Sequence, residues 1–130
     1  MNAKSGKRDE LEVTREDQAN INLFSWLSSK YTEMQAELGA KRESITQNDD
    51  AVTEIDIGDD DNDIRLKFGE CFFRADADTC REYLENSTKE LKEGAAQIES
   101  QMEDTKKKMA KLKTVLYSKF GSNINLEEDQ

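Results

Sequence analysis

The sequence contains no histidine and no proline, and each absence excludes a class of chemistry or structure. Without histidine, serine–histidine and cysteine–histidine catalysis and histidine-based metal sites are excluded. Without proline, the strongest helix breaker is missing, which favours long helices. Cysteine is scarce too. Cys71 and Cys80 lack the Cys-x-x-Cys spacing of metal and redox sites, so we expect free thiols in a reducing compartment, the alternative being a disulfide between them.

Apolar residues are also few for a chain of 130 residues. Hydrophobic residues make up 35% of the chain, charged residues 37%, and the mean hydropathy is −0.93. The length suits one domain, but compact domains have about 45–50% apolar residues. The chain therefore has too little apolar material for a large core of its own. We expect it to be disordered, elongated or stabilised by partners.

Membrane, secretory and nucleic-acid roles are disfavoured. No apolar run approaches the ~18–20 residues of a membrane span. Residues 1–10 are charged and lack the apolar region of a secretory signal. The 29 acidic residues outnumber the 19 basic ones, giving a net charge of −10. That balance argues against sequence-independent binding to nucleic acid, which needs a basic face.

Two long segments, residues 14–50 and 76–120, carry apolar residues at alternating spacings of three and four. Stripes this narrow are typical of a two-stranded coiled coil. The connection of about 25 residues predicts an antiparallel arrangement of the two helices. The predicted seam residues are Phe24, Leu27, Tyr31, Met34, Leu38, Ile45 and Val52 in the first helix, and Leu84, Leu91, Ile98, Met102, Met109, Leu112 and Leu116 in the second.

Start and stop signals bound both helices. Thr14 and Asp17 have the spacing of a capping box, and Asp76 or Asp78 can cap the second helix. Gly121 follows Phe120 as a stop. Residues 1–13 then form a polar arm, residues 14–120 one domain and residues 121–130 a tail.

A register follows if apolar seam residues face one another. Pairs whose residue numbers add up to 136 place Phe24 on Leu112 and Asp17 on Lys119. The rival register, with sums of 129, would place Asp17 on Leu112. Burying a polar group against an apolar one costs free energy, so we predict the first register.

Between the helices, residues 51–75 are predicted to form a β-hairpin. Residues 51–57, 64–68 and 70–75 alternate or nearly alternate apolar and polar residues. An isolated hairpin is marginal in water. We therefore expect the hairpin to join a sheet or barrel shared with partner subunits, the alternative being that it folds against its own helix ends. The expected assembly residues are Ile55, Ile57, Leu66, Phe68, Phe72 and Phe73.

Eight acidic residues and no basic one lie in residues 49–63. Asp59, Asp61, Asp63 and Glu70 match four positions of a calcium-binding EF-hand loop, but Ile64 stands where that loop needs glycine. We therefore predict no metal site here. A solvated acidic loop, facing a basic partner surface, is the favoured interpretation.

The far end of the predicted coiled coil has more apolar residues than its seam requires. Such a group indicates an exposed contact patch, or else side chains that pack together to seal the helix ends. No phosphate-binding Gly-x-x-x-x-Gly-Lys loop is present, so we expect no cofactor or nucleotide and no enzymatic activity. The additional apolar residues are Ile21, Leu23, Trp26, Tyr117, Phe120, Ile124 and Leu126.

Three segments resemble the beta-type subunits of the prefoldin family. They are Leu-Tyr-Ser-Lys-Phe-Gly-Ser-Asn-Ile-Asn-Leu-Glu at residues 116–127, Val-Thr-Arg-Glu-Asp-Gln at 13–18 and Phe-Gly-Glu-Cys-Phe at 68–72. The first is the most specific. The resemblance covers roughly residues 13–128, in the right order and spacing.

The resemblance implies a subunit of a heterohexamer of two alpha-type and four beta-type chains. Their hairpins would form a double β-barrel carrying six coiled coils. The coiled-coil tips would hold unfolded actin- and tubulin-like chains without ATP and pass them to the cytosolic group II chaperonin. The additional apolar residues at the far end would then contact clients. The resemblance also implies a cytoplasmic protein, with the nucleus as a second location. The alternative is a coiled-coil tether or scaffold without holding activity.

Overall fold

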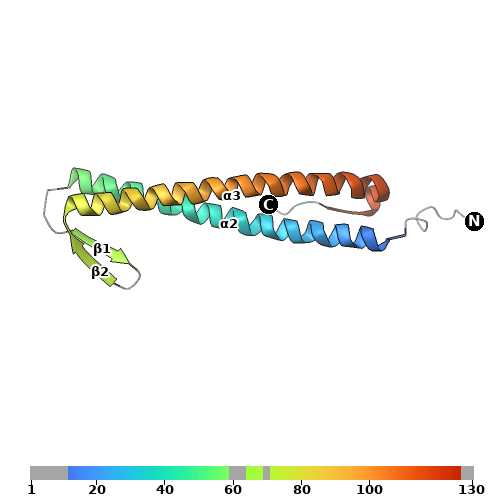
Figure 1. The fold of residues 1–130 in the computed structure, drawn as a ribbon, viewed down its shortest axis with the longest axis horizontal. Helices are drawn as coiled ribbons and strands as arrows, with labels where there is room; N and C mark the ends of the chain where they lie inside the picture. Colours follow the sequence, from blue (N-terminus) through green and yellow to red (C-terminus); the bar gives the residue numbers. More distant parts are fainter. Residues whose placement is uncertain (1–11, 59–63, 69–70, 127–130) are drawn as a thin grey trace, which may run out of the picture. The chain divides into compact units, whose positions relative to one another are not determined.

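The chain is mainly helical, and the computed structural model describes residues 12–58, 64–68 and 71–126 (Figure 1). The elements are helix α2 (Arg15–Ile57), strands β1 (Ile64–Phe68) and β2 (Cys71–Ala75), helix α3 (Ala77–Phe120) and the 3-10 turn η1 (Gly121–Asn123). Two compact units are present. The terminal unit comprises residues 1–35 and 100–130, and the central unit comprises residues 36–99.

The helix termini carry the predicted signals. At the start of α2, the Asp17 N–H donates to Thr14 Oγ1 and the Thr14 N–H donates to Asp17 Oδ2, both at 3.0 Å. At the start of α3, Asp76 is the cap, because its Oδ1 accepts the Thr79 N–H at 2.7 Å. Gly121 ends α3 with a φ of 56°, a left-handed conformation that favours glycine.

Contacts within each unit confirm the antiparallel direction of the helices and the predicted register. In the terminal unit, Lys119 forms an ion pair with Asp17, as predicted. In the central unit, Asn48 Nδ2 donates to Ser87 Oγ at 3.2 Å. Ser87 directly precedes Thr88, the residue that the predicted register places opposite Asn48. The rival register would have put Asp17 against Leu112.

The core of the central unit follows the predicted seam. Leu38, Leu84 and Ile98 are buried. Lys41 occupies a seam position, and its Cε would lie 3.3 Å from a Cβ built on Gly94. The aliphatic part of Lys41 therefore lies over Gly94. An added Cβ at Gly94 would require this flexible side chain to shift by a few tenths of an ångström, whereas glycine inside a helix costs about 1 kcal/mol relative to alanine.

Residues 51–57 are helical, so the prediction that they begin the β-hairpin is wrong. Helix α2 continues to Ile57, and the Gly58 N–H donates to the Glu54 carbonyl at 2.9 Å. Val52 and Ile55 are three residues apart, which places them on one helix face, and both are half-buried. Packing on that face outweighs the strand preference of β-branched residues. Ile55 and Ile57 are thus helical residues, and Ile57 is 77% exposed.

Strands β1 and β2 pair antiparallel, with Leu66 opposite Phe73 and Phe68 opposite Cys71. The four remaining predicted assembly residues, Leu66, Phe68, Phe72 and Phe73, lie on these strands. Their side chains lie outside what the structure describes. The comparison with a calcium-binding loop concerned residues that also lie outside the described ranges, namely Asp59, Asp61, Asp63 and Glu70.

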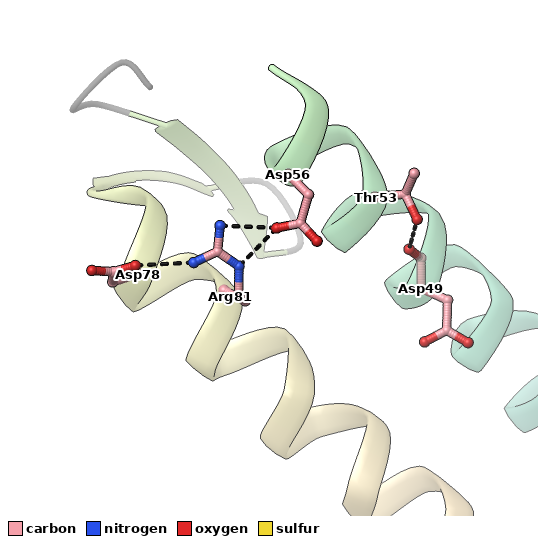
Figure 2. A network of polar contacts seen from close by, with 5 residues as sticks. All are labelled: Asp49, Thr53, Asp56, Asp78 and Arg81. Carbon is pink, nitrogen blue, oxygen red and sulfur yellow. Dashed lines mark hydrogen bonds and ion pairs between the residues drawn. The ribbon is translucent and has the colours of Figure 1, made fainter. Parts of the chain in front are cut away.

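A polar network joins the end of α2 to the start of α3 in the central unit (Figure 2). Arg81 lies between Asp56 and Asp78: its Nε donates to Asp56 Oδ1 and its Nη1 to Asp78 Oδ1, both at 2.9 Å. The hydrogen bond to Asp56 is the main reason that the pKa of Arg81 is raised. One turn earlier in α2, Thr53 Oγ1 donates to the Asp49 carbonyl at 3.0 Å. Arg81 therefore holds the two helix ends together by charge and hydrogen bonding.

Candidate functional site

The candidate site is the apolar end of the terminal unit. Phe24 and Leu27 of α2 are 4% and 5% exposed, and Met109 and Leu116 of α3 are 1% and 0% exposed. Six buried residues form one cluster, against which four partly buried side chains pack. The six are Phe24, Leu27, Met109, Leu116, Phe120 and Leu126, and the four are Ile21, Tyr31, Leu112 and Ile124.

The chain after α3 supplies a third component to this cluster. It turns back at Gly121, and the Ile124 N–H donates to the Gly121 carbonyl at 3.4 Å. Ile124 is extended, with φ −132° and ψ 146°. The Leu126 N–H then donates to the Tyr117 hydroxyl oxygen at 2.9 Å, and the Leu126 side chain is 7% exposed. We call residues 124–126 the tail segment.

Four of the seven predicted contact residues seal this end instead of presenting free surface. Phe120 and Leu126 are core residues, each 7% exposed, and Ile21 and Ile124 pack against the core. The interpretation that the additional apolar residues pack on one another therefore holds for these four. The seam pattern missed this because it counts two helices, whereas the tail segment adds a third layer.

The other three predicted residues are exposed. Trp26 is 57% exposed, Leu23 45% and Tyr117 37%. The Nζ of Lys30 lies 5.6 Å from the centre of the Trp26 ring, within range of a cation–π contact. Val115, which the sequence interpretation missed, is 53% exposed. Val115 directly precedes the seam residue Leu116, as Leu23 directly precedes the seam residue Phe24. This shared position could have identified Val115 from the sequence.

The exposed and sealed side chains lie on opposite sides of the seam. With Phe24 and Leu116 at heptad position a, Ile21 and Phe120 fall at position e, on the side where the tail segment packs. Leu23 and Val115 fall at position g. In an antiparallel coiled coil, e positions flank one side of the seam and g positions flank the other. Trp26, at the neighbouring position c, extends the g side. We call Leu23, Trp26 and Val115 the exposed patch.

Asp17 is the buried charged group of this end. Its side chain accepts hydrogen bonds from Lys119 and from the Thr14 N–H. The bond from Lys119 is the largest cause of the lowered pKa of Asp17, and the Thr14 N–H is the second. Because Asp17 is only 7% exposed, the Lys119 partner is what makes its negative charge tolerable there.

We expect the terminal unit to lose stability in acid through Asp17. The folded-state pKa of Asp17 lies below its ordinary value, so its contribution is present above the ordinary pKa and disappears as the pH falls through the lowered one. Amide hydrogen exchange of α3 near Lys119, followed from about pH 5 to pH 2, should show rising exchange relative to the intrinsic rate. Asp17→Asn should flatten this dependence, whereas Glu16→Gln, at the exposed neighbouring position, should leave it unchanged. Equal profiles for Asp17→Asn and the parent chain would contradict the prediction.

Cys80 is the one cysteine whose side chain the structure describes. Burial raises the pKa of the Cys80 thiol, and the nearby Asp76 raises it further. The Cys80 side chain is 0% exposed, which keeps its thiol away from reagents in the solvent. Among the described residues, no three His, Cys, Asp or Glu side chains gather as a metal site would require. Within the same ranges, no helix has the length and apolar character needed to cross a bilayer.

Known proteins resemble this chain over nearly its whole length. The family profile described as "Prefoldin subunit" matches residues 18–123. Prefoldin subunit 4 of Homo sapiens is 37% identical over 128 residues, which are 98% of this chain and 96% of that protein. Prefoldin subunit 4 of Saccharomyces cerevisiae is 34% identical over 122 residues, covering 94% of this chain and 95% of that protein.

A solved structure shares the fold. The prefoldin beta subunit from Thermococcus strain KS-1 matches with a TM-score of 0.73 and 15% sequence identity, over 85% of this chain and 97% of that one. At this identity the likeness concerns the fold alone. The family profile and the near-complete sequence matches go further, because they rest on sequence over most of the chain. This chain belongs to the prefoldin family of coiled-coil chaperone subunits.

Proposed function

We propose that this chain, as a prefoldin co-chaperone subunit, holds unfolded polypeptides at its terminal unit without ATP and passes them to the cytosolic group II chaperonin. Actin- and tubulin-like chains are the proposed clients, and the cytoplasm is the proposed location. The observation that carries the proposal is the exposed patch: Leu23, Trp26 and Val115 are each about half exposed although they adjoin a sealed core.

Weak apolar contacts suit a protein that must hold a client and then release it. Burying the exposed half of one large apolar side chain contributes about 1 kcal/mol. One patch would thus bind an unfolded segment weakly. Several subunits in one complex would bind the same client together, which raises the overall affinity without any single tight contact. Individual contacts would still break quickly, so a competing partner can take over the client.

Assembly through the strands is the second part of the proposal. Among the described residues, β1 and β2 pair only with each other. Each therefore has one edge at which a strand of another subunit can add. Two strands alone are marginal in water, so added strands would stabilise the pair. We propose that the other alpha- and beta-type prefoldin subunits supply them in a shared β-barrel.

The test replaces the exposed patch in the assembled complex. Leu23→Ser, Trp26→Ser and Val115→Ser together should weaken client holding about a hundredfold, because the patch then loses roughly 3 kcal/mol of burial and 1.4 kcal/mol corresponds to a factor of ten. The measurement is the concentration of complex that half-suppresses aggregation of chemically denatured actin.

The control places serine at Tyr83, an aromatic residue of the central unit that is 43% exposed and lies outside the expected assembly residues. This variant should hold actin as the parent does. Size-exclusion chromatography of both variants checks that they assemble. If the patch variant assembles and suppresses aggregation unchanged, the holding function is wrong, and a coiled-coil tether without holding activity becomes the better description.

A further inference from the structure

Lysines gather in the terminal unit, although the chain as a whole is acidic. Residues 18–32 and 105–126 together contain seven lysines and no acidic residue, whereas the whole chain has a net charge of −10. Asp17, which directly precedes the first of these ranges, already has Lys119 as its partner. Both ranges belong to the terminal unit, and together they include the exposed patch. The surface around the exposed patch is therefore locally basic.

Three of these lysines lie on the side of the seam that carries the exposed patch. With Phe24 and Leu116 at heptad position a, Lys30 and Lys108 fall at position g and Lys111 falls at position c. The residues of the exposed patch occupy the same two positions. All three lysine side chains are exposed. We call Lys30, Lys108 and Lys111 the basic strip.

The basic strip surrounds Trp26. In the confirmed register, Trp26 is level with Ala110, which lies between the two strip residues of α3. The third strip residue, Lys30, has its Nζ 5.6 Å from the centre of the Trp26 ring. The two aliphatic residues of the exposed patch lie nearer the helix ends. From Lys108 to the last of them the surface is about 10 Å long, which an extended segment of three or four residues spans.

Two charges of the basic strip have no acidic partner among the described residues. Lys108 and Lys111 form no ion pair there, and Asp104, one turn before Lys108, is not paired with it. Lys30 does pair, with Glu33 at 3.5 Å, but both side chains are exposed and such a pair contributes little. The basic strip can therefore bind carboxylates of another molecule without losing a strong interaction of its own.

We infer that the basic strip and the exposed patch together select unfolded segments in which apolar residues adjoin acidic ones. The inference rests on the proposed holding function and deepens it by naming the class of client segment. The acidic side chains of the segment lie along the basic strip, and its apolar side chains lie on Leu23 and Val115, with Trp26 between the two groups. Between client segments of equal hydrophobicity, the charge of the segment then decides which one binds.

An acidic polypeptide fits this surface better than a nucleic acid does. A single strand of nucleic acid binds through aromatic side chains on which successive bases stack. Here the basic strip adjoins two aliphatic residues and one tryptophan, which suit the side chains of a polypeptide. The net charge of −10 also repels a phosphate backbone, which has one charge per nucleotide, more strongly than it repels a segment with a few carboxylates.

Three labelled peptides test the inference on the assembled complex. They share the same apolar residues and differ only at three adjoining positions, which are all glutamate, all glutamine or all lysine. Each peptide carries a benzophenone group, so that the photo-cross-linked yield on this chain reports binding to this subunit alone. In the parent complex, the glutamate peptide should reach half-saturation at a roughly three- to tenfold lower concentration than the glutamine peptide, as a few exposed ion pairs would give. The lysine peptide should bind most weakly.

Lys108→Gln together with Lys111→Gln should reduce this preference to about twofold or less. The matched control is Lys89→Gln together with Lys92→Gln, which removes the same charge from exposed positions of α3 in the central unit. The control should leave the preference unchanged. Raising the salt concentration from about 0.05 to 0.5 M should weaken the preference of the parent complex, because salt screens exposed charges.

Equal binding of the three peptides by the parent complex, or an equal loss of preference in the two double variants, would overturn the inference. So would a single-stranded oligothymidylate that displaces the glutamate peptide at a lower concentration than the unlabelled glutamate peptide does, because a nucleic acid would then be the better ligand.

The inference and the proposed function fail in distinguishable ways. A complex that binds the three peptides equally and suppresses actin aggregation holds clients without selecting them by charge, so only the inference fails. A complex that binds none of the peptides and does not suppress aggregation holds no client, so the proposed function fails and the inference fails with it.

Discussion

Replacing Leu116 by alanine should destabilise the terminal unit by about 2–5 kcal/mol, the usual cost of a cavity left by a buried leucine. Leu116 is 0% exposed and lies in the cluster with Phe24, Leu27 and Met109. The loss should be local, because the central unit has a core of its own. Amide exchange measured in the assembled complex should therefore rise in the last turns of α3 by about thirty-fold or more, since 1.4 kcal/mol corresponds to a factor of ten.

The neighbouring residue provides the control for this cavity. Val115 is also aliphatic and lies on the same helix, but it is 53% exposed. Val115→Ala should change stability by less than about 0.5 kcal/mol, as is usual for surface substitutions. If the two variants increase amide exchange equally, burial does not distinguish these positions and the tail segment does not form the described third layer.

Proline placed in β1 should prevent assembly with the other subunits. Leu66 and Lys67 lie opposite Phe73 and Phe72 in the antiparallel pair. In such a pair, neighbouring residues alternate between those whose N–H bonds the partner strand and those whose N–H points to the outer edge. Proline at one of the two positions removes a hydrogen bond between β1 and β2. Proline at the other removes a hydrogen bond from β1 to the proposed strand of another subunit. We expect both variants to fail to co-elute with the other prefoldin subunits in size-exclusion chromatography.

The two proline variants are controls for each other. If the outer edge of β1 carried no strand of another subunit, only the variant that breaks the inner pairing should affect assembly. Normal assembly by either variant would thus contradict the proposed shared barrel. Far-ultraviolet circular dichroism of both should show the helices α2 and α3 intact, because neither position lies in a helix.

Local signals in the sequence were sufficient for the start of α2, for both ends of α3 and for the alignment of the two helices. Thr14, Asp17 and Gly121 mark helix ends through hydrogen bonds and backbone angles that involve only nearby residues. The register was also predictable, because only one alignment pairs Asp17 with Lys119. These features depend on spacing along the chain, which is what a sequence displays directly.

Features that depend on packing by a third element were not predictable in the same way. The alternation of Val52, Ile55 and Ile57 suits a strand in isolation, but the continuing helix face decides their conformation. Phe120 and Leu126 looked like additional surface residues, because nothing local states that the chain returns over α3 at Gly121. The exposed patch was found only in part: Leu23 and Trp26 were predicted, and Val115 was not.

The position of Asp17 has a consequence for how this end of the molecule comes apart. One carboxylate completes the first turn of α2 and also anchors the last turn of α3 through Lys119. Fraying of either helix terminus therefore removes a partner from the other. A double-mutant cycle between Thr14→Ala and Lys119→Met should accordingly give a coupling energy different from zero, although each of these two side chains bonds Asp17 and not the other. The start of α2 and the end of α3 should therefore unfold together, as one cooperative unit.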